Sequence, residues 1–162
     1  MGRKTLVSRA GNVIGGGDWS RDRLIPDLMR AIRSGGEFIC RNPAAIRPWQ
    51  HVLEPLKGYL LAAEHVFSGG VTDPLNFGPD HTEVSTVKDI IAMILSEFNL
   101  PDTAIVCNDS ASQKEASYLL LDSSAVKHLL DWKPVWCVSE AVKHTSRWYK
   151  SYFELGPERT QA

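Results

Sequence analysis

Four polar side chains in the first third of the chain could together hold a phosphorylated ligand. Asn12 lies in the glycine-flanked run AGNVIGGG, and Arg41, Asn42 and Arg47 lie in the run RNPAAIRPWQHV. A planar guanidinium can bind two phosphate oxygens at once, and a carboxamide can donate to a phosphate or a sugar hydroxyl. This combination is typical of a site for a phosphorylated small molecule. Each residue also has an ordinary alternative, since Asn12 can satisfy its own loop backbone and Arg47 can be a surface residue.

The elements that must position these residues are short strands alternating with helices. Brief apolar runs predict extended segments, and the first of them leads into the loop that carries Asn12. The expected extended segments are Lys4–Val7, Glu37–Cys40, Ile46–Val52, Pro74–Phe77, Ile105–Cys107 and Tyr118–Leu121. The pattern predicts one compact α/β unit without a complete doubly wound sheet.

Helices are expected between these strands. The clearest is Thr86–Phe98, where apolar residues recur every three or four positions and Thr86 with Asp89 resembles a capping box. Another should have Pro26 in its first turn, with Asp22 available as a cap, and end at Gly35. The remaining helices are Leu53–Phe67, with Leu53, Leu56, Leu60 and Phe67 on one apolar face, a short helix ending at Leu130, and Ser139–Phe153.

The composition is that of a globular protein without a strongly charged surface. The 162 residues carry a formal net charge of −1, which argues against a broad nucleic-acid-binding face or a polybasic membrane surface. Three scattered cysteines show no paired spacing, so neither a metal site nor a disulfide framework is expected. No apolar run reaches membrane-spanning length, and the first residues are too poor in apolar side chains for a signal peptide. We therefore expect a cytoplasmic protein.

Several separate motifs resemble the extended short-chain dehydrogenase/reductases that act on nucleotide sugars. They are SRAGNVIGGGDWSRDRLIPD, RNPAAIRPWQHVLEP, NFGP and QKEASYLLLD, and they are nearest to those of the CDP-glucose 4,6-dehydratases. The resemblance implies an α/β fold made of a partial Rossmann-like sheet and a small α/β substrate-binding domain. It further implies that residues 1–155 are the C-terminal nucleotide-sugar-binding portion, that 156–162 form a disordered tail, and that the NAD-binding half is absent.

The resemblance also implies roles for individual residues. Asn12 and Arg47 would contact the diphosphate or sugar of a CDP-sugar, and Arg41 and Asn42 would lie on its nucleotide side. The other implied contacts are base packing by Leu24 and Ile25, and a partial wall for the nicotinamide ring from Ala10, Gly11 and Val13.

Two further positions are weighed against the family pattern. Lys114 stands where His is usual in QKEASYLLLD, the segment that closes over the substrate. A Lys could still reach phosphate there, but as a point charge on a flexible stem. The usual pKa of a histidine lies near neutrality, which would suit a catalytic role for His51. The family pattern instead favours a structural role, in which His51 orients the strand that carries Arg47.

Two motifs of the family's chemistry do not occur in this sequence. No G-x-G-x-x-G is present, and none of the four tyrosines has Lys four residues later. In the family, NAD takes a hydride from C4 of CDP-glucose, water is lost across C5–C6, and the hydride returns to C6. We expect this chain to supply substrate contacts and no catalytic residue, to bind no NAD by itself, and to self-associate through an exposed sheet edge.

Two other functions remain open from the sequence. One is a related epimerase or dehydratase for a different nucleotide sugar, which the base-side residues would decide. The other is a non-catalytic paralogue that only binds nucleotide sugars.

Overall fold

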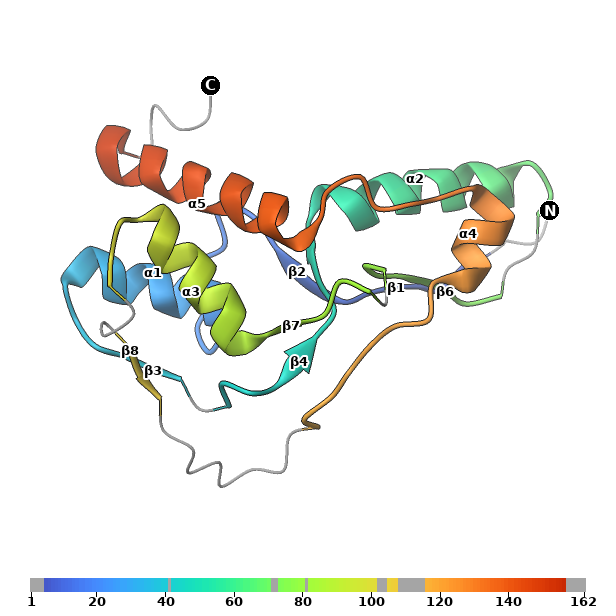
Figure 1. Ribbon diagram of the computed structural model, residues 1–162. Helices are drawn as coiled ribbons and strands as arrows, with labels where there is room; N and C mark the ends of the chain where they lie inside the picture. Colours follow the sequence, from blue (N-terminus) through green and yellow to red (C-terminus); the bar gives the residue numbers. More distant parts are fainter. Residues whose placement is uncertain are drawn as a thin grey trace.

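Short strands covered by helices build the fold, as the predicted α/β class requires (Figure 1). The computed structural model describes residues 5–40, 42–70, 73–80, 82–101, 105–107 and 116–156. Within them the strands are β1 (Ser8–Ala10), β2 (Asn12–Ile14), β3 (Phe38–Cys40), β4 (Ile46–Arg47), β5 (Trp49–His51), β6 (Leu75–Phe77), β7 (Ser85–Thr86) and β8 (Ile105–Cys107). The helices are α1 (Leu24–Ser34), α2 (Leu53–Phe67), α3 (Val87–Glu97), α4 (Ser124–Leu130) and α5 (Val138–Leu155).

The strands pair two by two instead of forming one large sheet. β1 pairs with β6, β2 with β5 and β3 with β8, all in parallel, while β4 and β7 pair antiparallel. Parallel strands need crossover connections, and helices supply these here. The β1–β6 pair has the Rossmann-like character that the sequence predicts.

The larger of two hydrophobic cores lies between α1, α3 and α5. Its fully buried members include Met29 of α1, Ile90 and Ile94 of α3, and Val142 and Tyr149 of α5. The predicted face of α3 is therefore the buried one. Thr86 and Asp89 also form the predicted capping box, in which the Asp89 amide donates to the Thr86 hydroxyl at 3.1 Å.

The second core lies beneath α2, beside α4 and β6. Phe77 and Trp132 are fully buried there, with ring centroids 5.2 Å apart and planes at 89°. In Figure 1 this part of the molecule, with α2 above β1 and β6, lies apart from the group of α1, α3 and α5. Gly58 of α2 faces the Phe77 ring so closely that an added Cβ would lie 2.3 Å from it. The helix can therefore approach β6 only because this position has no side chain.

Two expectations about these elements are wrong. The first strand runs over Ser8–Ala10 and not over Lys4–Val7, although the Val7 carbonyl already accepts a bond from Leu75; Lys4 lies outside the described residues. Asp22 does not cap α1, because it has a positive φ of 60° and Arg23 is the residue at the cap.

Helix α2 has the predicted bounds. Its apolar face of Leu53, Leu56, Leu60 and Phe67 is exposed, between 47% and 93% of each residue. The buried side of the helix carries Glu54, Pro55, Gly58 and Ala62. Tyr59 and Leu61 of α2 also pack against the second core, whereas the residues of the exposed face do not.

No helix in the described part of the chain combines the length and apolar character needed to cross a bilayer.

Candidate functional site

A cleft of about 910 Å³ opens between the β2–β5 pair, the start of α1 and strand β3. Its walls bring together residues that are far apart in the sequence. From the predicted set it contains Gly11, Asn12, Val13, Leu24, Ile25, Asn42 and Arg47. Volumes of this size are typical of pockets for small ligands and cofactors.

Asn12 is held at the cleft by a close approach between two backbone segments. Its amide donates to the Pro48 carbonyl at 2.9 Å, and it lies opposite Trp49 in the β2–β5 register. A Cβ on the preceding residue, Gly11, would lie 2.4 Å from the same Pro48 oxygen. Only glycine therefore permits this crossing, which leaves the half-buried Asn12 at the wall of the cleft.

Arg47 lies on β4 and is half-buried, with one guanidinium nitrogen donating to the Ile46 carbonyl at 2.9 Å. Strand β4 is paired on two sides. β7 lies along one side, and on the other the Ile46 amide donates to Ser117 while its carbonyl accepts from Leu119. The described end of the predicted closing segment is thus anchored next to Arg47.

The first turn of α3 fixes the loop that leads into β4. The Val87 amide donates to the Ala45 carbonyl and the Lys88 amide to the Pro43 carbonyl, both at 2.9 Å. Amides at a helix N-terminus have no partner within the helix, so these bonds satisfy them. The helix that the sequence predicts best thereby positions the segment between Asn42 and Arg47.

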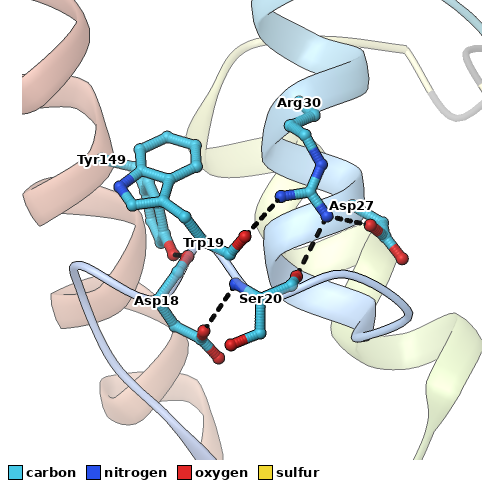
Figure 2. A network of polar contacts seen from close by, with 6 residues as sticks. All are labelled: Asp18, Trp19, Ser20, Asp27, Arg30 and Tyr149. Carbon is cyan, nitrogen blue, oxygen red and sulfur yellow. Dashed lines mark hydrogen bonds and ion pairs between the residues drawn. The ribbon is translucent and has the colours of Figure 1, made fainter.

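The loop before α1 is fastened by the polar network of Figure 2. Arg30 donates to the carbonyls of Trp19 and Ser20 at 2.9 and 3.0 Å and pairs with the Asp27 carboxylate. The Tyr149 hydroxyl donates to the Asp18 carbonyl at 2.5 Å, and burial raises the pKa of Tyr149 to about 12. Tyr149 is therefore a neutral donor that ties the loop to α5.

The consecutive glycines of this loop serve packing. An added Cβ on Gly16 would lie 2.1 Å from the Trp148 ring, and one on Gly15 would lie 2.9 Å from the Val52 side chain. Trp148 in turn stacks on Tyr152 at 5.4 Å. The Gly-rich run therefore lets the loop lie flat against α5 while its other side lines the cleft.

The charges around the cleft are mixed. Arg23 and Arg47 line it, and so do Asp18, Asp22 and Asp27, of which Asp27 is paired with Arg30. Burial tends to raise the pKa of Asp18, but hydrogen bonds from Ser20 outweigh it, so this pKa is lowered and the carboxylate stays charged. In the described residues no group of three His, Cys, Asp or Glu side chains could hold a metal ion.

Known proteins show what this chain is similar to. No protein-family model matches the chain. CDP-glucose 4,6-dehydratase of Salmonella typhimurium is 40% identical over 146 residues, a match that covers 89% of this chain and 40% of that protein. This chain is therefore similar to part of a nucleotide-sugar 4,6-dehydratase.

Solved structures of nucleotide-sugar enzymes show the same similarity at the level of fold. The chain matches dTDP-glucose 4,6-dehydratase of Bacillus anthracis in complex with NAD with a TM-score of 0.78 and 18% identity, over 93% of this chain and 46% of that one. It matches UDP-glucuronic acid 4-epimerase of Bacillus cereus, in complex with UDP-glucuronic acid and NAD, with a TM-score of 0.77 and 18% identity, over 90% and 45%. The chain thus spans less than half of the length of these relatives.

Not all of the residues assigned from the family resemblance lie at the cleft. Ala10 is absent from its lining and sits one residue before Gly11, at the end of β1. Arg41 and Lys114 lie outside the described residues, so their predicted contacts remain predictions. The other assigned residues share one cavity, and their contacts with a ligand also remain predictions.

Sequence reasoning missed Arg23, which is exposed at the mouth of the cleft where α1 begins. The available signal was an Arg directly before the apolar residues that open a helix, in RDRLIP. It also missed Phe38 and Cys40, two buried residues of β3 that form an inner wall. A buried strand beside a site looks like ordinary core in a sequence, so no signal distinguished them.

His51 lies outside this cleft lining, in line with the structural role that the family pattern favours. It is 8% exposed, its Nδ1 accepts from the Leu53 amide at 3.3 Å, and its ring meets Trp136 edge-on at 4.8 Å. Burial lowers the pKa of His51, and nearby His144 lowers it further. The imidazole is therefore held neutral at the junction of β5 and α2.

This arrangement predicts a stability change with pH. The unfolded chain binds a proton at His51 near its usual pKa of 6.5, whereas the folded chain resists protonation to lower pH. Stability should therefore be full above pH 6.5 and decline as pH falls below it. We expect His51→Asn, which keeps an acceptor for the Leu53 amide but cannot titrate, to reduce the fall in Tm between about pH 7 and pH 5. The exposed His128→Asn variant is the control, and equal slopes for wild type and His51→Asn would contradict the prediction.

Proposed function

We propose that the cleft binds CDP-glucose as the substrate-holding part of an NAD-dependent CDP-glucose 4,6-dehydratase. The observation that carries the proposal is the convergence of Asn12 and Arg47 on one cavity, in a chain 40% identical to a protein with this activity. Arg23 adds a second cation at the same cavity. Two arginines and a carboxamide suit a diphosphate bearing a sugar.

The cleft also offers a place for the base. Leu24 and Ile25 at the start of α1 and Phe38 of β3 give it an apolar side, and Asn42 adds a half-buried carboxamide. We place the base against these residues and the diphosphate near Arg47. This assignment agrees with the roles that the sequence resemblance implies for Leu24, Ile25 and Asn42.

In the proposed reaction this chain binds and orients the sugar nucleotide. NAD, when bound, would supply hydride transfer to and from the sugar. Arg47 and Arg23 would hold the diphosphate and thereby fix the sugar at the Asn12 end of the cleft. A proton-transferring Tyr–Lys pair has no counterpart in this sequence, so the chemistry needs groups from outside it.

A related epimerase is the second candidate, because epimerase structures match the fold as well as dehydratases do. The two candidates differ in the base and sugar they bind. Tighter binding of CDP-glucose than of UDP-glucose or UDP-glucuronic acid supports the dehydratase, and the reverse order supports the epimerase.

We expect Arg47→Ala to weaken CDP-glucose binding by about one to two decades, because a charge-assisted bidentate contact contributes about 1.5–3 kcal/mol. Arg47→Lys keeps the charge but loses the planar fork, so its affinity should lie between those of wild type and Arg47→Ala. Dissociation constants from NMR titration measure this, with the exposed Arg147→Ala of α5 as the control. The same Arg→Lys change in a full-length homologue that has this motif should raise KM. Unchanged affinity and unchanged KM would show that Arg47 is not a ligand residue.

We expect the isolated chain to show no turnover of CDP-glucose and no tight binding of NAD. The reason is that neither the Tyr-x-x-x-Lys pair nor the glycine fingerprint is in its sequence. Incubation with CDP-glucose and NAD, followed by the ultraviolet signal of the 4-keto sugar in base, tests turnover. Calorimetry tests NAD binding. Turnover above an enzyme-free blank, or micromolar affinity for NAD, would contradict this expectation.

We also propose that the isolated chain self-associates through the outer edge of β1. Within the described residues β1 pairs only with β6, and an open strand edge is a template for pairing with another chain. Light scattering over a range of concentrations measures this association.

A further inference from the structure

The loop before α1 and the end of that helix border a second hollow of the surface. This hollow, named here the arginine groove, has a volume of about 620 Å³ and shares no lining residue with the cleft. It is lined by Trp19, Arg21, Arg30, Arg33 and Ser34. None of these described residues is acidic, although the whole chain carries a formal net charge of −1. The groove is therefore a local concentration of positive charge.

Two of these arginines have no carboxylate partner in the described part of the chain. Arg21 and Arg33 are both exposed, and neither forms an ion pair with a described residue. The Arg33 guanidinium lies over two rings of α5, with its Cζ 5.9 Å from the centroids of Tyr152 and of Phe153. A guanidinium placed on aromatic rings keeps its charge and presents its N–H donors around its edge. Both side chains can thus donate to an anion without first breaking an ion pair.

Arg30, the other arginine of the groove, is held in place by several acceptors. It donates to the carbonyls of Trp19 and Ser20 at 2.9 and 3.0 Å and pairs with the Asp27 carboxylate (Figure 2). Trp19 in turn packs edge-on against Tyr149, with ring centroids 5.2 Å apart. This side of the groove is therefore fixed before a ligand binds, which lowers the entropic cost of binding.

The arginine groove and the cleft are lined by different residues of the same segment. Asp18 and residues 22–27 line the cleft, whereas Trp19, Arg21 and Arg30 line the groove. The ion pair between Arg30 and Asp27 therefore connects the two cavities. An anion that binds Arg30 from the groove competes with Asp27 for its charge. The Asp27 carboxylate then repels an anionic ligand in the cleft more strongly.

We propose that the arginine groove binds a polyphosphate group and thereby weakens the binding of a nucleotide sugar in the cleft. A chain of phosphates carries several charges and presents acceptor oxygens over a longer span than a single carboxylate does, so it suits a groove with several guanidinium groups. Arg21 and Arg33 would supply most of the affinity, and Arg30 would transmit the effect to Asp27. The effect on the cleft rests on the proposed function, whereas binding in the groove does not.

Titration of the full chain with inorganic pyrophosphate at constant ionic strength tests the groove. The indole N–H signal of Trp19 in the NMR spectrum, assigned by its loss in Trp19→Phe, reports binding. We expect a saturable shift whose dissociation constant rises at least about tenfold in Arg21→Ala/Arg33→Ala, because two charge-assisted contacts are lost. Both residues are exposed, so this double variant should keep the Tm of wild type. Arg147→Ala, at an exposed arginine of α5, is the matched control and should bind pyrophosphate as wild type does.

ATP and adenosine identify the source of the phosphates. Adenosine has no phosphate and should not shift the Trp19 signal. Tighter binding of ATP than of pyrophosphate assigns a nucleotide as the ligand, and weaker binding assigns a free polyphosphate. Binding of adenosine as tight as that of pyrophosphate would show that the groove does not recognise phosphate and would overturn the proposal.

The connection to the cleft is measured with CDP-glucose. Saturating pyrophosphate should weaken CDP-glucose binding to wild type about fivefold, at the low end of ordinary coupling between two sites, and should leave binding to Arg21→Ala/Arg33→Ala unchanged. A loss of affinity that persists in the double variant indicates direct competition in the cleft and overturns the proposal. An unmoved Trp19 signal, or equal pyrophosphate affinities of wild type and double variant, also overturns it. If CDP-glucose does not bind wild type, the proposed function fails, and the pyrophosphate titration by itself decides whether the groove binds phosphate.

Discussion

The buried carboxylate of Glu54 fixes the start of α2 to the segment that connects α4 and α5. Glu54 is 3% exposed and accepts hydrogen bonds from the amides of Val135 and Trp136 at 3.0 and 2.9 Å. Its own carbonyl accepts from the Trp132 indole at 3.2 Å. A carboxylate removed from water is tolerated only when donors surround it, so this geometry leaves little freedom. Because α2 begins just after β5, this contact positions the second core next to a strand that lines the cleft.

The cleft owes its shape to backbone constraints more than to large buried surfaces. Strands of two or three residues contribute few hydrogen bonds, so the close crossing of Gly11 over Pro48 and the first turn of α3 must fix the geometry. The aromatic side chains of α5 do the same for the loop before α1, where Trp19 meets Tyr149 edge-on at 5.2 Å. The loop before β4 and the loop before α1 are therefore each fixed by contacts with a helix.

The sequence predicted those parts of the fold in which local and tertiary requirements agree. In α3 the apolar period and the capping box of Thr86 and Asp89 indicate the same helix. The apolar face that the period predicts is the buried one. In α2 the period also indicated one apolar face, but a period does not show which side of a helix finds a partner. The side that is buried needs small residues, because Gly58 must approach Phe77, and it needs Glu54 as an acceptor. Neither requirement can be read from hydrophobicity.

For the cleft, the motifs gave Asn12 and Arg47, whereas Arg23, Phe38 and Cys40 became visible only once α1 and β3 were placed.

The connection between β1 and β2 links the cleft to the strand pair of the second core. Only Gly11 separates β1, which lies at the open sheet edge, from β2, which begins with Asn12 at the cleft. Gly11 is locked against Pro48, so the end of β1 cannot move without moving Asn12. The position of Asn12 at the cleft is therefore coupled to the register in which β1 pairs with β6.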